Sequence, residues 1–339
     1  MPNAMAKFVF SLPSSILTAM AGGRVEVDGK VLDPRIALMA KQAAARPSMT
    51  AFPPTMAREG MKAAFAMIDA PRRANVAVRD LKVPGAAGDL DARLYTPPGA
   101  TGDEPLLVYM HQGGCVIGGV WTCDTWCSIL SEDVRAVVLN VDYRHAPEHK
   151  FPAAVDDAVA AFDWAVANAK DLGADGKRVG VGGDSAGGYL SAVVCQARKR
   201  AGLSQPWLQL LIYPATDWTS KDGSMVTMGD AYPLNAEVMA WFTAQYLNDP
   251  EAEASDWRCS PALAPDKTGL ARALIFTAGF DPLTTQAEAY SRMLKDAGVE
   301  TLYRNYPSLS HSFTAMSGAV PAARDALEEI AQDVKRAFG

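Results

Sequence analysis

Short apolar runs alternate with helical stretches over most of this 339-residue chain. Runs of this kind are typical of strands buried on both faces of a sheet, and they lie at 106–110, 136–141, 179–182, 208–213, 273–278 and 301–306. Two β-patterned segments with a Gly- and Pro-rich turn between them, 76–83 and 90–96, come first and predict an antiparallel start. Helical periodicity fills the intervening segments at 152–172, 185–200, 285–297 and 321–338. We therefore predict an α/β fold with an eight-stranded, mostly parallel sheet flanked by helices.

Two regions do not follow this alternation. Residues 1–70 and 215–261 carry helical patterns separated by Pro and Gly, at 36–45, 56–68 and 236–247. We expect both regions to pack over the carboxyl ends of the strands, where open α/β sheets hold their ligands. They would form a helical cap over a catalytic domain made of residues 71–214 and 262–339.

Charge and hydropathy exclude two classes of protein. The 32 Lys and Arg residues against 38 Asp and Glu residues leave a net charge of −6 without a long block of like charge, which argues against nucleic acid as a partner. No window approaches the roughly 20 apolar residues that span a bilayer, so no membrane span is expected. Residues 8–21 are apolar after Lys7, but Pro13 interrupts them, which favours a docked N-terminal helix over a signal peptide.

Neither the cysteines nor the histidines predict a metal site. Five cysteines without a C-x-x-C pair favour free thiols in a reduced, cytoplasmic chain. Cys123 and Cys127 could share a helix face, but no further ligand follows at zinc spacing. Residues 145–149 match the H-x-x-E-H pattern of some zinc peptidases. That chemistry needs one continuous helix, which Pro147 would break, so we expect neither a metal nor another cofactor.

The most informative motif is Gly183-Asp184-Ser185-Ala186-Gly187, a G-x-S-x-G that follows a predicted strand and opens a predicted helix. A tight turn there projects the Ser185 hydroxyl from the sheet, and crowding excludes side-chain bulk at 183 and 187. The helix start offers free N–H groups and a positive dipole end to a developing negative charge. We interpret Ser185 as a nucleophile; the alternative is a Gly-rich turn with a helix-capping serine.

A serine nucleophile needs a base, and the chain has four histidines. His111 starts a Gly-rich turn and His145 and His149 lie in a Pro-containing stretch, which leaves His311 after the last predicted strand. Its alternative role is that of an exposed loop residue. The acid that orients the base is expected after the penultimate strand, where Asp281 lies.

Asp281 could instead cap the next helix. Asp217 follows an earlier strand, and Asp256 and Asp266 lie farther from any strand end, so these three are weaker candidates. Acyl transfer also needs hydrogen-bond donors for the oxyanion. The candidates are the N–H groups of Gly113, Gly114 and Ala186.

Several motifs together resemble the hormone-sensitive lipase family of bacterial esterases. They are His111-Gln112-Gly113-Gly114, 142–148, 151–154, 183–188, 281–283 and His311, and they extend over nearly the whole chain. The resemblance implies an α/β-hydrolase core under a helical cap built from an N-terminal segment and an insertion. It also implies a triad of Ser185, Asp281 and His311, with an oxyanion hole formed by Gly113, Gly114 and Ala186.

The chain departs from the family pattern near the site. Gln112 replaces a glycine of His-Gly-Gly-Gly, Cys115 stands where an aromatic residue is frequent, and Ser312 replaces the glycine after the histidine. At 284–286 the chain has Thr, Thr and Gln, where the family commonly has charged residues. We expect these changes to affect pocket shape and substrate preference more than catalysis. Gln112 would alter the backbone of the turn or reach toward the acyl group.

The sequence thus predicts a serine carboxylesterase for short- to medium-chain acyl esters. Ser185 attacks the carbonyl, His311 shuttles the proton and Asp281 orients His311. A small-molecule ester is the expected partner, and a homodimer through an exposed sheet edge is one option. Two alternatives remain open: amide or formamide hydrolysis by the same triad, and a non-catalytic ligand-binding receptor, as in plant hormone receptors of similar sequence that have lost triad members.

Overall fold

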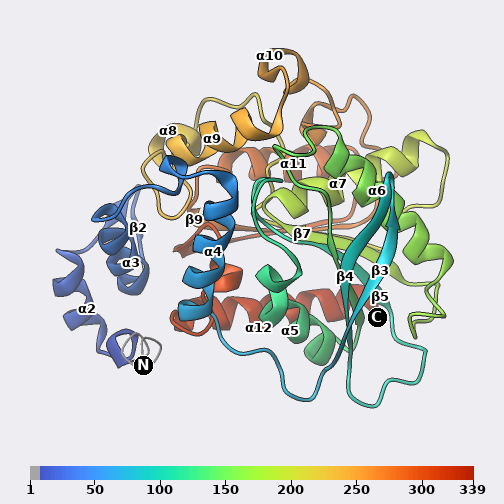
Figure 1. The fold of residues 1–339 in the computed structure, drawn as a ribbon, viewed down its shortest axis with the longest axis horizontal. Coiled ribbons are helices and arrows are strands. Elements are labelled where there is room, and N and C mark those ends of the chain that lie inside the picture. Colours follow the sequence, from blue (N-terminus) through green and yellow to red (C-terminus); the bar gives the residue numbers. More distant parts are fainter. Residues whose placement is uncertain (1–7) are drawn as a thin grey trace.

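A computed structural model describes residues 8–339, with one eight-stranded sheet at the centre (Figure 1). Its strands are β3 (Ala77–Gly85), β4 (Gly88–Thr96), β5 (Leu106–Met110), β6 (Val137–Asp142), β7 (Val179–Asp184), β8 (Gln209–Ile212), β9 (Ala273–Phe280) and β10 (Thr301–Ser310). They lie in the order β10-β9-β8-β7-β5-β6-β4-β3. Strands β5 to β10 are parallel, while β4 pairs antiparallel with both β3 and β6. The predicted α/β fold and all eight predicted strands are confirmed.

Helices cover both faces of the sheet. One face carries α5 (Asp124–Val134) and α12 (Pro321–Phe338), and the other carries α6 (Ala153–Ala167), α7 (Ala186–Arg200) and α11 (Thr284–Asp296). Successive residues of a strand point to opposite faces. In β5, Val108 joins the core beneath α6 and α7, whereas Leu107 and Tyr109 join the core beneath α5 and α12. The central strands are apolar throughout because both of their faces are covered.

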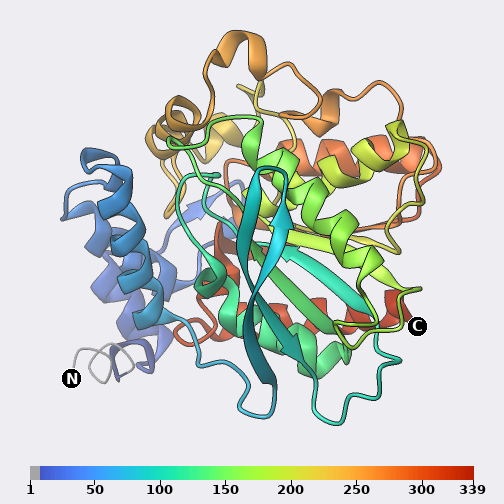
Figure 2. The ribbon, with the colours of Figure 1, turned by 45° about the vertical axis from the view of Figure 1, so that its right-hand side comes forward.

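Some element boundaries differ from the prediction. The hairpin of β3 and β4, at the near side of the sheet in Figure 2, is longer than expected, because Gly85 pairs with Gly88 across a two-residue turn. Pro84 is tolerated there since β3 is an edge strand. Helix α6 ends at Ala167, where the Asn168 side chain donates a hydrogen bond to the Trp164 carbonyl.

Several elements are not predicted by the sequence, among them helix α5 and a small two-stranded sheet. Helix α5 buries Ser128 and Ser131 together with its apolar residues, so polar side chains interrupt its apolar periodicity. The small sheet of β1 (Glu26–Val27) and β2 (Lys30–Val31) is too short to show an alternating pattern.

The N-terminal region forms helices beside the sheet. They are α2 (Ser14–Ala21), α3 (Pro34–Ala44) and α4 (Pro54–Ile68). The expected N-terminal helix is present as α2, which starts only after Pro13 and buries Leu17 completely. Lys7, which bears on the signal-peptide alternative, lies outside the described residues. No helix within residues 8–339 is both long and apolar enough to cross a membrane.

The two regions outside the alternation, residues 1–70 and 215–261, contact each other at one end of the strands. Residues 215–261 contribute α8 (Ser224–Thr227), α9 (Ala236–Tyr246) and α10 (Pro250–Glu253). Met49 from the N-terminal region packs with Val238 of α9 against Leu283, which follows β9. This apolar cluster therefore lies at the carboxyl ends of the strands.

Asp69, at the end of α4, contacts the segment that follows His311. Its carboxylate accepts hydrogen bonds from the Ser317 hydroxyl and the Ala70 N–H, each at 2.8 Å. Burial outweighs these hydrogen bonds and raises the pKa of Asp69 to about 6 from a usual 3.8. The folded state therefore binds the proton more tightly than the unfolded state. Protonated Asp69 therefore makes its full contribution to the free energy of unfolding below about pH 4, and this contribution is lost as the pH rises through about 6.

Asp69→Asn should remove this pH dependence. The free energy of unfolding of the variant minus that of wild type should be larger at pH 7 than at pH 4 by roughly 1–3 kcal/mol. Denaturant unfolding at the two pH values measures the difference. Asp80→Asn is the control, because a hydrogen bond from Arg93 lowers the pKa of this exposed carboxyl, so its change should have the opposite sign. Equal pH dependence of Asp69→Asn and wild type would contradict the prediction.

Candidate active site

Ser185 lies at the sharp turn from β7 into α7. Its backbone has φ 54° and ψ −115°, a conformation that costs a residue other than glycine of order 1–3 kcal/mol. The two flanking glycines are required by contact. A Cβ atom at Gly183 would lie 2.3 Å from the carbonyl carbon of Gly187, and one at Gly187 would lie 1.9 Å from the Met110 oxygen. Close packing of β5, β7 and α7 thus holds Ser185 in its strained conformation.

Ser185, His311 and Asp281 meet at the carboxyl ends of β7, β9 and β10. Nε2 of His311 lies 2.9 Å from Oγ of Ser185, and Nδ1 lies 2.7 Å from Oδ2 of Asp281. The exposed fractions are 8% for Ser185, 4% for His311 and 0% for Asp281, so little water competes for these contacts. Because a carboxylate only accepts, Nδ1 carries the hydrogen and Nε2 of a neutral ring is free to accept the serine proton.

Asp281 does not cap helix α11, because the N-cap residue is Leu283 and no side chain caps this helix. Oδ1 of Asp281 accepts the N–H of Leu283 at 2.8 Å in the turn that leads into α11. Each carboxylate oxygen therefore has its own partner, and the turn fixes the oxygen that faces His311.

The three weaker acid candidates are bonded elsewhere. Asp217 accepts hydrogen bonds from Thr219, Asp256 pairs with Arg258 at 2.7 Å, and Asp266 pairs with Lys199 at 2.6 Å. Within residues 8–339, His311 forms no hydrogen bond or ion pair with any of them.

Sequence reasoning missed the side chains that pack behind His311. The ring of Tyr213 lies 4.7 Å from that of His311, centroid to centroid. The Tyr213 hydroxyl and the Thr314 hydroxyl both donate to Oδ2 of Asp184, at 3.0 and 2.8 Å. Burial raises the pKa of Asp184. Asp184 occupies a variable position of the G-x-S-x-G motif, so the motif gave no sign of this role.

The turn after β5 contains Gly113 and Gly114 and begins next to the turn at Ser185. Met110 pairs with Gly183 in the sheet, so residues 111–114 begin next to the turn at Ser185. Gly113 and Gly114 have φ values of 133° and 62°, and the Gly113 carbonyl accepts from the N–H groups of residues 116 and 117. Within residues 8–339, the N–H groups of Gly113 and Gly114 have no acceptor. Ala186 is the first residue of α7, where N–H groups lack an intrahelical acceptor.

Two departures from the family pattern contact each other. Oε1 of Gln112 accepts a hydrogen bond from the Ser312 hydroxyl, and Nε2 of Gln112 donates to the Thr314 hydroxyl at 3.2 Å. Ser312 has φ 63°, a left-handed conformation that explains why glycine is usual there. Gln112 is only 1% exposed and is bonded to the segment after His311, so it does not extend toward an acyl group. Cys115 is completely buried.

Helix α9 lies directly on the turn that contains Gly113 and Gly114. A Cβ atom at Gly114 would be 2.4 Å from the ring of Phe242. Phe242 also packs on the cluster that contains Leu234, Val238 and Leu283. The insertion thus covers the carboxyl ends of the strands next to Ser185.

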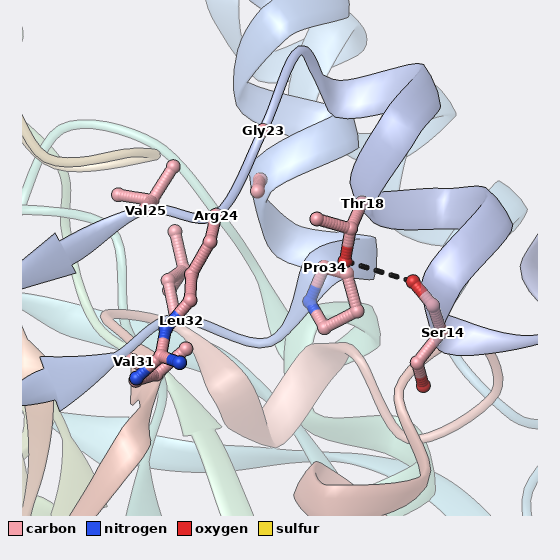
Figure 3. Close-up of a pocket in the computed structure, with 9 residues that line it drawn as sticks. Ser14, Thr18, Gly23, Arg24, Val25, Val31, Leu32 and Pro34 are labelled. Atoms are coloured by element: carbon pink, nitrogen blue, oxygen red, sulfur yellow. Dashed lines mark hydrogen bonds between the residues drawn. The ribbon is translucent and has the colours of Figure 1, made fainter.

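A separate pocket of about 360 Å³ lies in the N-terminal region, between α2, β2 and α3 (Figure 3). It is lined by Ser14, Thr18, Gly23, Arg24, Val25, Val31, Leu32, Pro34 and Ala37. None of these residues belongs to the predicted site. The Thr18 hydroxyl is bonded to the Ser14 carbonyl at 2.8 Å, and no histidine or carboxylate lines the pocket. It therefore offers no base to activate a hydroxyl.

The relatives found by comparison with known proteins include ester hydrolases. A family described as alpha/beta hydrolase fold matches residues 107–315. The carboxylic ester hydrolase LipN of Mycobacterium tuberculosis is 42% identical over 92% of this chain and 85% of its own length. The ethyl acetate hydrolase of Pseudomonas putida is 37% identical over 73% of this chain and 78% of its own.

Solved structures agree with these relatives. The ester hydrolase EH1AB1 from the metagenome of Lake Arreo, complexed with a derivative of bipyridine phosphonate, has a TM-score of 0.87 and 38% identity, covering 91% of this chain and 99% of that one. An esterase of Pyrobaculum calidifontis has a TM-score of 0.83 and 36% identity, covering 90% and 98% of the two chains.

Proposed function

The chain belongs to the hormone-sensitive lipase family of α/β hydrolases, and we propose that it hydrolyses carboxylic esters with Ser185, His311 and Asp281 as its catalytic triad. The observation that carries the proposal is the continuous contact from hydroxyl to imidazole to carboxylate, at 2.9 and 2.7 Å. Relatives named as esterases over most of the chain support an ester as the substrate.

The geometry supports acyl transfer in two steps. Nε2 of His311 takes the proton of Ser185 as the hydroxyl attacks the ester carbonyl, and then gives it to the leaving alcohol. Water attacks the resulting acyl-enzyme with His311 again as base, which releases the acid and restores the serine. Asp281 keeps the ring in the required tautomer and stabilises its positive charge.

The oxyanion of each tetrahedral intermediate would be bound by the N–H groups of Gly113, Gly114 and Ala186. Support comes from their free donors and from the helix start at Ala186, whose dipole favours negative charge. Donors of this kind typically contribute about 10²- to 10³-fold each to the rate.

Residues 1–70 and 215–261 would act as a cap over a catalytic domain of residues 71–214 and 262–339. The contact of Phe242 with Gly114 and the cluster around Leu283 support this division. An apolar cover of this kind suits short- to medium-chain acyl esters. We also propose that self-association uses an open sheet edge, since β10 and β3 are edge strands.

The cytoplasm is the proposed location. All five cysteines are free and buried, and burial raises the pKa of Cys115 and Cys195, which keeps these thiols protonated and unreactive. Free thiols of this kind fit a reducing compartment.

A fluorophosphonate tests the proposal directly, because it reacts with an activated serine. Wild type should be labelled stoichiometrically on the peptide that contains Ser185, as read by mass spectrometry. Ser191→Ala should be labelled equally, because it removes a different buried hydroxyl, in the helix that follows Ser185, which bonds only the Gly187 carbonyl. Absence of labelling would indicate a ligand-binding receptor instead of an enzyme.

The substrate class requires a second measurement on the same protein. p-Nitrophenyl esters from acetate to laurate should be hydrolysed with the highest kcat/KM among the short and medium chains. The matched butyryl anilide should react far more slowly. Faster hydrolysis of the anilide would identify an amide hydrolase.

A further inference from the structure

Three potential metal ligands converge at the start of the turn that contains Gly113 and Gly114. They are His111, where the turn begins, Asp142, at the end of β6, and His145, three residues later. The two Nε2 atoms lie 3.4 Å apart, and each lies 3.2 Å from Oδ1 of Asp142. Two imidazole nitrogens and one carboxylate oxygen thus form a nearly equilateral triangle.

The triangle has the dimensions of one face of a tetrahedral metal site. Ligand atoms about 2.0–2.1 Å from a zinc ion in tetrahedral geometry lie about 3.3–3.4 Å from one another. An ion at that distance from all three atoms would lie within about 1 Å of their plane and keep a fourth position for water. The three ligand atoms already have the spacing that such an ion requires.

The hydrogen bond at the opposite ring nitrogen of His111 turns its Nε2 toward the other two ligands. Nδ1 of His111 lies 2.8 Å from the carbonyl oxygen of Gln112, so Nδ1 donates its hydrogen there, and Nε2 faces Asp142 and His145. A cation satisfies all three at once. A backbone carbonyl on the opposite ring nitrogen is also the partner that metal-bound histidines usually have.

The surroundings hold the ligands in place and admit an ion. The ring of His111 stacks on Tyr143 at 4.5 Å and 12°. A Cβ atom at Gly118 would be 2.7 Å from Nδ1 of His111, so the chain packs closely behind that ring. The side chain of Asp142 is 29% exposed and that of His145 is 15% exposed, which gives access from solvent. The nearby cation Arg58 is paired with Glu148 at 2.7 Å.

We propose that His111, Asp142 and His145 bind a divalent transition-metal ion of the zinc class through Nε2, Oδ1 and Nε2. The bound ion joins the turn that carries Gly113 and Gly114 to the chain after β6. Ser185 and His311 are not among its ligands, so the site is independent of the triad.

This site is distinct from the H-x-x-E-H pattern at 145–149. Residues 146–149 form a turn and no helix, as expected from Pro147, and His149 is exposed. Glu148 is bonded to Arg58. Only His145 is shared, and its partners come from the ends of β5 and β6.

Isothermal titration of the chelator-treated, full-length chain with ZnCl₂ tests the proposal. Wild type should bind one Zn²⁺ per chain, and its thermal midpoint should rise with Zn²⁺ concentration. His145→Gln and Asp142→Asn should each weaken binding at least 100-fold. His149→Gln should bind like wild type. Co²⁺ should give the visible absorption of a four-coordinate site in wild type and in His149→Gln.

Circular dichroism checks that the variants fold. If His145→Gln does not fold, His145→Cys replaces it, because a thiolate is also a zinc ligand and should retain binding. Failure of wild type to bind Zn²⁺ would mean that a shared proton holds the three side chains together, and the proposal would be wrong. Loss of binding in His149→Gln, or undiminished binding in His145→Gln, would place the ion elsewhere and overturn it as well.

Discussion

Ser185→Ala is expected to lower kcat/KM for p-nitrophenyl butyrate by roughly 10⁴- to 10⁶-fold. The variant lacks the only oxygen that His311 can activate in the contact at 2.9 Å. Alanine retains the Cβ atom, so the strained backbone at position 185 and the packing of Gly183 and Gly187 are unchanged. The folded state should therefore survive, and the loss should appear in kcat. Steady-state kinetics together with a thermal melt measure both quantities.

Ser191→Ala is the matched control for this variant. Ser191 is also buried on α7, and its hydroxyl bonds a backbone carbonyl of the same helix at 2.8 Å. Its removal should leave kcat/KM within a few-fold of wild type. If Ser185→Ala hydrolyses the ester as fast as wild type, the assignment of the nucleophile is wrong.

Asp281→Asn should lower kcat by roughly 10⁴-fold with little change in fold. An asparagine amide would donate to Nδ1 of His311, which forces the hydrogen onto Nε2 and leaves that nitrogen unable to accept the serine proton. The amide oxygen can still accept from the Leu283 N–H, so the turn into α11 is retained. The expected result is a stable protein with an inactive tautomer of histidine.

Two further variants make this result specific. Asp256→Asn breaks an ion pair with Arg258 but should retain wild-type kinetics. The double variant Ser185→Ala, Asp281→Asn should be no slower than Ser185→Ala alone, because the members of a triad act as a unit. An equal loss in Asp256→Asn, or additive losses in the double variant, would refute the role assigned to Asp281.

Much of the fold follows from local sequence pattern. The eight strands could be predicted because both faces of the sheet are covered, which makes each strand an apolar run. Helix α5 could not, because Ser128 and Ser131 lie on its buried side. The two-residue strands β1 and β2 offer no periodicity at all. Prediction from sequence pattern alone thus fails where polar side chains are buried and where an element is very short.

In the candidate site, too, some residues could be predicted from the sequence and others could not. Ser185, Asp281 and His311 could be selected because each follows a strand, and the carboxyl ends of parallel strands lie at the same end of the sheet. Their catalytic roles remain a prediction. Tyr213, which packs on His311, could not be selected, because its place depends on tertiary contacts. The same holds for the convergence of His111, Asp142 and His145, since local spacing points only to the false pattern at 145–149.

The bond between Gln112 and Ser312 has a consequence for engineering by recombination. The two residues are 200 positions apart in a chain of 339, so any single crossover between them, with a relative that has glycine at both positions, would separate them. A hybrid that keeps Gln112 alone would leave a buried amide oxygen without that donor, and one that keeps Ser312 alone would leave its hydroxyl without that acceptor. Libraries made by gene shuffling should therefore inherit the two positions together, as one unit.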